Sequence, residues 1–131
     1  MIYLDTSAFV KLVRAEPETD ALRAFLGGAQ DQDLVSSVLL ATETRRAVQR
    51  RALPSLARAD LRLTRVRQVD LTHAVVETAG RLPQPDLRTL EAVHVATALL
   101  LRDEISNLVT YDVRMAAAAT AEGLPVVTPV G

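Results

Sequence analysis

Short apolar runs alternate along the chain with longer stretches in which apolar residues recur every three or four positions. The runs predict five short strands, at 2–4, 34–35, 68–71, 107–110 and 126–128. The stretches between them predict helices, over 6–13, 17–26, 38–51, 54–67, 74–82, 87–102 and 115–122. Strands joined through helices pair in parallel with right-handed crossovers. The pattern therefore predicts a three-layer α/β/α fold around a short central parallel sheet.

Residues that favour helix starts and ends mark the boundaries of these elements. Ser36 and Ser37 are candidate N-caps for the helix that runs to about 51, and Thr72 for the helix over 74–82. Gly123 closes the last helix. No repeat, linker or low-complexity tract interrupts the alternation, so we expect a single domain over 1–131.

Composition narrows the possible classes of protein. The chain has 131 residues, of which 49% are hydrophobic and 24% charged, as expected of a globular domain with its own core. It contains no cysteine, which excludes disulfide scaffolds, zinc ribbons, iron–sulfur clusters and thiol nucleophiles. The sequence shows no signal-peptide pattern and no apolar run near the roughly 18 residues that span a bilayer, so we expect a cytoplasmic protein.

Two acids follow predicted strands that belong to one sheet. Asp5 comes directly after the strand at 2–4, and Asp112 comes two residues after the strand at 107–110. Ligands of open parallel sheets bind outside the carboxyl ends of the strands. Asp is also a common helix N-cap, so a cap role alone stays open for each residue. Two acids in equivalent places favour a shared site.

Two further acids lie on apolar faces of predicted helices. Glu43 follows Leu39 by one turn, and Glu91 precedes Val95 by one turn. A carboxylate that faces a core is unfavourable unless it is paired, hydrogen-bonded or bound to a metal. An ion pair with an arginine such as Arg88 is the alternative to a functional role. Four converging carboxylates with no cysteine or histidine ligand select Mg²⁺ or Mn²⁺, which points to phosphoryl chemistry.

Four segments resemble, in order and spacing, the motifs of PIN-domain ribonucleases of the VapC type, the toxins of type II toxin–antitoxin pairs. They are YLDTSAFVKL at 3–12, the stretch 36–47 around Glu43, LRTLEAVHVATA at 87–98 and VTYDVRM at 109–115. The resemblance implies a PIN-like fold and a Mg²⁺-dependent endoribonuclease, with Mn²⁺ as an alternative ion. It also implies a homodimer and a VapB-type antitoxin as partner.

The resemblance assigns roles to individual residues. Asp5, Glu91 and Asp112 would hold the cation, while Glu43 would bind a second ion or orient the attacking water. Cleavage would leave a 5′-phosphate and a 3′-hydroxyl. Ser7 and Thr110 would orient waters or carboxylates, although ordinary cap and strand roles suit both equally well. This chain has Glu91 where the family usually has Asp. A weakened PIN-fold module that binds RNA or a protein without cleavage is therefore the alternative function.

Positive charge is concentrated in one part of the chain. The segment between 44 and 68 contains eight arginines and a single acid, Asp60. It therefore carries a net charge of +7, while the rest of the chain carries −8. We interpret the segment as a flank that binds the RNA backbone, because aromatic residues for base stacking are scarce. The candidate RNA-binding residues are Arg45, Arg46, Arg50 and Arg51. Two solvated helix faces, or a groove for an antitoxin segment, are the alternatives.

The remaining titratable residues and two rival folds change this prediction little. His94, on an apolar helix, is interpreted as a packed and hydrogen-bonded core residue, and Lys11 as a solvated one. A receiver-type phospho-acceptor domain needs a lysine at a late strand end, but Lys11 is the only lysine. A haloacid-dehalogenase phosphatase needs Asp two residues after its first strand-end Asp, and this chain has Ser7 there.

Overall fold

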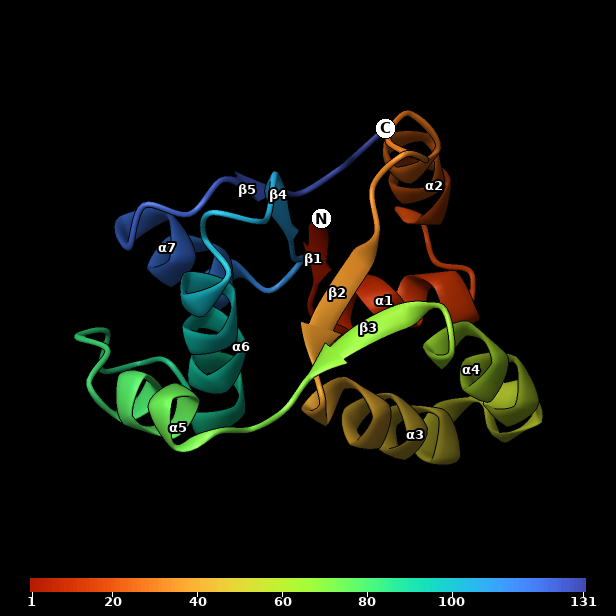
Figure 1. The fold of residues 1–131 in the computed structure, drawn as a ribbon. Coiled ribbons are helices and arrows are strands. Elements are labelled where there is room, and N and C mark those ends of the chain that lie inside the picture. Colours follow the sequence, from red (N-terminus) through yellow and green to blue (C-terminus); the bar gives the residue numbers. More distant parts are fainter.

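A five-stranded parallel sheet forms the middle layer of the molecule (Figure 1). The computed structural model describes residues 1–131. The strands lie in the order β3-β2-β1-β4-β5. Their bounds are β1 (Ile2–Leu4), β2 (Leu34–Ser37), β3 (Val66–Val69), β4 (Asn107–Val109) and β5 (Val126–Val127). The central strand β1 is buried along its whole length because its three residues are all apolar and both of its faces are covered.

Helices cover both faces of the sheet, as the sequence predicts. Their bounds are α1 (Thr6–Val13), α2 (Thr19–Gly27), α3 (Leu39–Arg51), α4 (Leu56–Leu63), α5 (His73–Gly80), α6 (Thr89–Leu100) and α7 (Val113–Ala121). A short 3₁₀ turn, Leu53–Ser55, joins α3 to α4. Helices α1 to α4 lie on one side of the sheet and α5 to α7 on the other (Figure 1). The α/β/α expectation is confirmed.

Alternation along β1 divides the core into two halves. Ile2 and Leu4 pack with Phe9 and Leu40 from α1 and α3. Tyr3 points to the opposite face and packs within the cluster formed by α6 and α7. The Tyr3 side chain therefore projects from β1 toward α6, two positions before Asp5.

The largest differences from the predicted boundaries lie around β2 and β3. The sequence predicts Ser36 and Ser37 as caps of α3, but both belong to β2, where they pair in register with β3. The Ser37 hydroxyl still accepts a hydrogen bond from the Leu39 amide at 3.1 Å. The helix expected over 54–67 ends at Leu63 and the strand expected at 68–71 begins at Val66, because β3 gains backbone pairing with β2.

Lys11 is buried, so its interpretation as a solvated residue is wrong. Its Nζ pairs with Glu18 at 3.0 Å and Glu16 at 3.4 Å. It also lies 4.7 Å from the centre of the Tyr111 ring, which gives the ammonium group a cation–π contact. None of the helices is long and apolar enough to cross a membrane.

The order of the strands in the sheet reverses at β1. The chain runs from β1 to β2 and β3 on one side, and later returns to β4 on the other side of β1. In open parallel sheets such a switch in strand order creates a crevice at the carboxyl ends of the strands. Asp5 and Asp112 lie at this edge, after β1 and β4.

Candidate active site

Asp5 is a buried carboxylate that ends β1 and caps α1. Its side chain is the N-cap of the helix and accepts the Ala8 amide at 2.9 Å. It also accepts the hydroxyls of Ser7 at 2.7 Å and Thr110 at 2.6 Å. The residue is only 3% exposed. Burial raises the pKa of the Asp5 carboxyl above its ordinary value, while the hydrogen bond from Thr110, the nearby His94 and the bond from Ser7 act to lower it.

Thr110 connects Asp5 to the second strand-end acid. Its hydroxyl is fully buried, donates to Asp5 and accepts the backbone amide of Asp112 at 3.0 Å. The Asp112 carboxylate caps α7 by accepting the Met115 amide at 2.9 Å. Ser7 completes the connection, because its hydroxyl accepts the Tyr111 amide at 2.9 Å. Asp5 and Asp112 are thus helix caps and also neighbours at one edge of the sheet.

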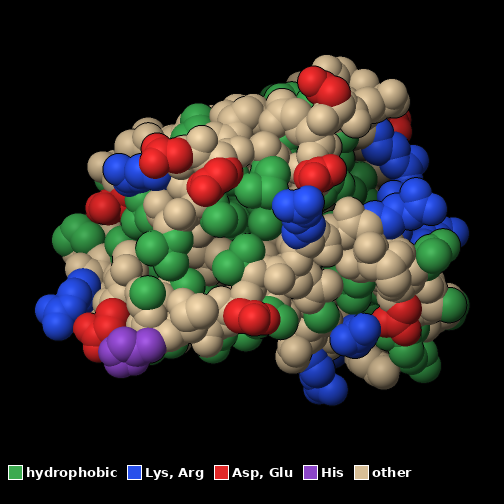
Figure 2. Space-filling model, in the orientation of Figure 1, with side chains coloured by type: hydrophobic (Ala, Val, Ile, Leu, Met, Phe, Trp, Pro, Cys, Tyr) green, Lys and Arg blue, Asp and Glu red, His purple; other side chains and the backbone are tan.

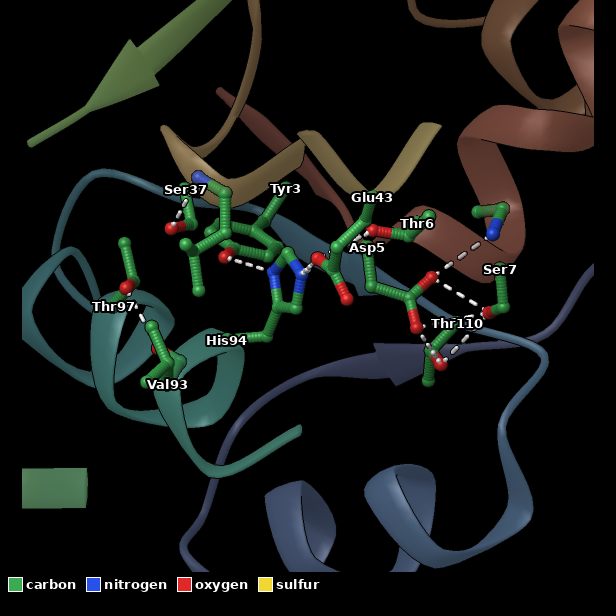
Figure 3. A network of polar contacts seen from close by, with 12 residues as sticks. Tyr3, Asp5, Thr6, Ser7, Ser37, Glu43, Val93, His94, Thr97 and Thr110 are labelled. Carbon is green, nitrogen blue, oxygen red and sulfur yellow. Dashed lines mark hydrogen bonds and ion pairs between the residues drawn. The ribbon is translucent and has the colours of Figure 1, made fainter. Parts of the chain in front are cut away.

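Glu43 belongs to a separate chain of hydrogen bonds (Figure 3). Its Oε1 accepts the Thr6 hydroxyl at 2.8 Å and lies 2.7 Å from Nε2 of His94. The other nitrogen of that ring, Nδ1, lies 2.7 Å from the hydroxyl of Tyr3. His94 is 3% exposed, which agrees with its interpretation as a packed and hydrogen-bonded residue. Burial raises the pKa of the Tyr3 phenol far above its ordinary value, so this hydroxyl keeps its proton.

Glu91 is engaged by the start of its own helix and by an arginine. Its Oε1 accepts the backbone amide of Arg88 at 3.0 Å, as in a capping box. Its Oε2 lies 3.4 Å from the guanidinium of Arg114. The ion pair expected as the alternative role of Glu91 is therefore present, with Arg114 in place of Arg88. Glu91 and Asp112 line one hollow of about 390 Å³ together with both arginines.

The four acids share the carboxyl edge of the sheet, but each is held by its own protein partners. No three of the Asp, Glu and His side chains lie close enough together to hold a metal ion. Each carboxylate is instead bound by its own partners, which are backbone amides for Asp5 and Asp112, His94 for Glu43 and Arg114 for Glu91.

The chemistry of the donor set nevertheless fits a hard divalent cation. All four predicted ligands offer carboxylate oxygens, the type of ligand that Mg²⁺ and Mn²⁺ prefer. Asp5 gives the strongest indication of a cation site, because it is 3% exposed and forms no ion pair with any lysine or arginine. A buried carboxylate with neutral donors alone retains an uncompensated charge, which a bound cation would balance.

The four arginines predicted to bind RNA lie in different surroundings. Arg46 and Arg50 line a hollow of about 370 Å³ that also contains Glu43 and Thr6. Arg45 instead pairs with Asp60 at 2.9 Å, and Arg51 lines a small apolar hollow beside Val10 and Val13. On the face shown in Figure 2, Lys and Arg side chains gather mainly over α2, α3 and α4.

Sequence reasoning missed three residues of this site. Thr6 and Tyr3 both contact the Glu43–His94 pair, and Arg114 contacts Glu91. Tyr3 and Thr6 flank Asp5 by two and one positions, so their place beside the strand end was a usable signal. Arg114 and Glu91 lie 23 residues apart on two different helices, and no local pattern indicates their contact.

A short parallel sheet with acids at the ends of β1 and β4 is the architecture expected of a PIN domain. The sequence model of the PIN domain family matches residues 2–122. The chain therefore belongs to the PIN domain family.

Its relatives place it among the VapC-type members of that family. It is 38% identical over 131 residues to ribonuclease VapC35 of Mycobacterium tuberculosis, covering 98% of this chain and 97% of that protein. It is 39% identical over 128 residues to ribonuclease VapC46 of the same organism, with the same coverage.

Solved structures show the same fold at lower identity. VapC20 of Mycobacterium tuberculosis, described as a sarcin–ricin loop cleaving toxin, has a TM-score of 0.75 at 21% identity, covering 98% of this chain and all of that one. VapBC2 from Rickettsia felis, bound to a DNA fragment from its promoter, has a TM-score of 0.76 at 17% identity, covering 98% of this chain and 99% of that chain.

Proposed function

We propose that the protein is a Mg²⁺- or Mn²⁺-dependent endoribonuclease toxin that is neutralised by a VapB-type antitoxin. The observation that carries this proposal is the buried Asp5 carboxylate, which has no cationic partner at the carboxyl edge of a PIN-domain sheet. The 38% identity of the chain to ribonuclease VapC35 supports the same reaction class.

The residues divide the work of phosphodiester hydrolysis among them. Asp5, Glu91 and Asp112 would hold the ion, and Glu43 would bind a second ion or act on the attacking water. When bound, the ion supplies charge stabilisation at the phosphate and a more acidic water. Ser7 and Thr110 fix the Asp5 carboxylate, and Thr110 also fixes the Asp112 backbone. Arg46 and Arg50, which line the same hollow as Glu43, would bind the RNA backbone.

The reaction is tested by incubating the purified chain with total RNA in Mg²⁺, in Mn²⁺ and in EDTA. We expect discrete cleavage that requires the ion and leaves 5′-phosphate and 3′-hydroxyl ends. Asp112→Asn serves as the inactive control. Cleavage that continues in EDTA, or a 2′,3′-cyclic phosphate end, contradicts the proposal.

A second function is favoured by one specific contact. The pairing of Glu91 with Arg114 at 3.4 Å already supplies a positive charge to one predicted ligand. A PIN-fold module that binds RNA or a protein without cleaving it would retain this pair. RNA binding without ion-dependent cleavage in the same incubation would favour this alternative.

Substitution of the arginines beside Glu43 is expected to weaken RNA binding. The double variant Arg46→Ala/Arg50→Ala removes two charges from the hollow, so the slope of log affinity against log salt should flatten by about 0.7 per lost phosphate contact. Arg81→Ala/Arg102→Ala is the matched control, because it also removes two charges and both arginines lie outside the 44–68 segment. Filter binding across a salt series measures the slopes. Equal slopes for the two variants contradict this assignment.

The homodimer is proposed to form over an apolar hollow between α5 and α6. The hollow has a volume of about 490 Å³. Among its lining residues, Leu71 is 45% exposed, Val76 is 50% exposed and Leu90 is 48% exposed. Leu90 also lines both hollows that contain the acids Glu43 and Glu91. A second copy seated here would therefore lie beside the site.

Charge placed in this hollow is expected to separate the protomers. We expect Val76→Glu/Leu90→Glu to be a folded monomer, because burying two carboxylates in an apolar contact is unfavourable. Leu100→Glu is the control, since Leu100 is 49% exposed and lies outside the hollow. Light scattering after size-exclusion chromatography gives the masses. A monomeric wild-type protein contradicts the proposed dimer.

The antitoxin is proposed to contact the arginine-bearing face of α3. A small hollow is lined by the apolar side chains of Val10, Val13 and Val48 and by Arg14, Arg51 and Glu16, of which Glu16 pairs with Lys11. An antitoxin segment with an acidic group beside apolar residues would match that lining. To test this partner, the protein encoded by a short reading frame next to this gene is added to the cleavage reaction. We expect it to keep the RNA intact.

A further inference from the structure

Tyr3, His94 and Glu43 form a continuous polar chain through the core, and the proposed function assigns a role only to Glu43. The Tyr3 hydroxyl and Nδ1 of His94 are 2.7 Å apart, as are Nε2 of His94 and Oε1 of Glu43. The three residues come from β1, α6 and α3. Figure 3 shows the imidazole ring between the phenol and the carboxylate. Tyr3 is 0% exposed and His94 3% exposed, so water does not supply these bonds.

The chemistry of the three groups gives the chain a direction. An ionised carboxylate only accepts hydrogen bonds, so Nε2 of His94 carries the proton that lies toward Glu43. In a neutral ring Nδ1 is then the acceptor. The Tyr3 hydroxyl is a donor at 2.7 Å from that nitrogen. The ring edge also meets the Tyr3 ring at 83°, which holds its plane.

The direction of the chain has a consequence for the two oxygens of Glu43. Oε1 accepts both Nε2 of His94 and the Thr6 hydroxyl, at 2.7 and 2.8 Å. Oε2 takes no hydrogen bond from the protein. The carboxylate is thus pinned at one oxygen and left available at the other, even though it is carried by a long and flexible side chain.

We propose that His94 and Tyr3 are positioning residues. They fix Glu43 through Oε1 and leave Oε2 free to contact the attacking water or an ion. This inference rests on the proposed ribonuclease function, in which Glu43 acts on the attacking water or an ion. Partners that orient a ligating or basic group typically change activity by about 10–100-fold when they are removed.

A pair of carboxamide variants separates positioning from packing. The amide nitrogen of Gln reaches the place of Nε2, so His94→Gln keeps a donor for Glu43. Asn is one methylene shorter and reaches only the place of Nδ1, so His94→Asn keeps the Tyr3 contact and loses the Glu43 contact. We expect His94→Asn to lower kcat for RNA cleavage by about 10–100-fold with little change in KM, and His94→Gln to retain most of kcat.

Two further variants complete the series. Tyr3→Phe removes only the hydroxyl that holds the ring nitrogen, and we expect a loss in kcat smaller than that of His94→Asn. Thr44→Val is the matched buried control, because the Thr44 hydroxyl lies one residue after Glu43 and has no hydrogen-bond partner. We expect it to retain the wild-type kcat. Equal kcat for the folded Asn and Gln variants overturns the proposal, as does a loss in Thr44→Val that matches that of His94→Asn.

A nitrogen-15 NMR measurement tests the chain without relying on activity. The protein has two histidines, and His73→Gln leaves His94 as the only one. We expect Nε2 to carry a fixed proton that lies toward Glu43. An Nε2 without a proton, or averaging of the proton between the two nitrogens, overturns the proposal even if no variant folds. A wild-type chain that cleaves no RNA but shows this fixed Nε2 proton refutes the proposed function and leaves the geometry standing.

Discussion

Asp5→Asn is expected to abolish ion-dependent RNA cleavage while stabilising the ion-free fold. Asn has the same shape, and the Ser7 and Thr110 hydroxyls can each rotate to accept from its amide. The substitution removes a carboxylate that is 3% exposed and has no cationic partner. We expect cleavage to fall by more than about 100-fold, since loss of partners that merely orient ligands typically costs 10–100-fold.

The stability gain of this variant is expected to depend on pH. Burial raises the pKa of Asp5 in the folded chain. A carboxyl with a raised folded pKa stabilises the fold below its unfolded pKa, and this contribution is lost as the pH rises through the folded value. Asn does not titrate, so the advantage of Asp5→Asn over wild type should grow with rising pH in EDTA.

Urea unfolding in EDTA at a series of pH values measures this difference. Added Mg²⁺ should then raise the unfolding midpoint of the wild type and leave that of Asp5→Asn unchanged, because a ligand stabilises only the state that binds it. A folded Asp5→Asn protein that cleaves RNA at the wild-type rate would refute the proposed site. A stability difference that shrinks with rising pH would contradict the account of the buried charge.

Thr110→Val is expected to impair both the fold and the reaction. Its hydroxyl donates to Asp5 at 2.6 Å and accepts the Asp112 amide at 3.0 Å, so Val leaves the Asp112 amide without a partner and leaves Oδ2 of Asp5 with the Ser7 hydroxyl as its remaining donor. The unpaired amide alone costs about 1–3 kcal/mol of stability. The hydrogen bond from Thr110 is also the largest influence that lowers the pKa of Asp5, so its loss should raise that pKa further. We expect cleavage to fall about 10–100-fold.

Thr110→Ser provides the matched comparison, because it keeps the hydroxyl and removes only a methyl group. It should retain most of the cleavage rate and lose a modest part of the stability through the small cavity left behind. Rates measured well below each variant's unfolding temperature separate the two effects. Equal rates for the Ser and Val variants would show that the hydroxyl does not position the acids.

Most of the fold could be predicted because local pattern and tertiary structure agree along most of the chain. The strand β1 is apolar at every position and is followed at once by a capping Asp5, so both its end and the start of α1 were clear. The β3 strand was misplaced because Val66 also fits a helical spacing with Leu63. Its true state depends on pairing with Leu34 of β2, which lies 32 residues earlier.

The site could be predicted only in part, for a related reason. Asp5 and Asp112 follow strands, and the rule for strand ends needs only the order of elements. The contact of Glu43 with His94 requires α3 and α6 to meet at one particular level, 51 residues apart in sequence. A helical pattern identifies the inward face but not the partner across it, so His94 was assigned to the core without its carboxylate.

The hydrogen bond between Thr110 and Asp5 also bears on how the protein comes into being in the cell. It spans 105 residues, and it forms only after β4 has paired with β1 in the middle of the sheet. Chains emerge from the ribosome N-terminus first, so residues 1–100 leave the exit tunnel before the threonine that completes the Asp5 environment. A nascent or truncated chain that stops before β4 therefore lacks the hydrogen bonds through which Thr110 joins Asp5 to Asp112, and with them the proposed site.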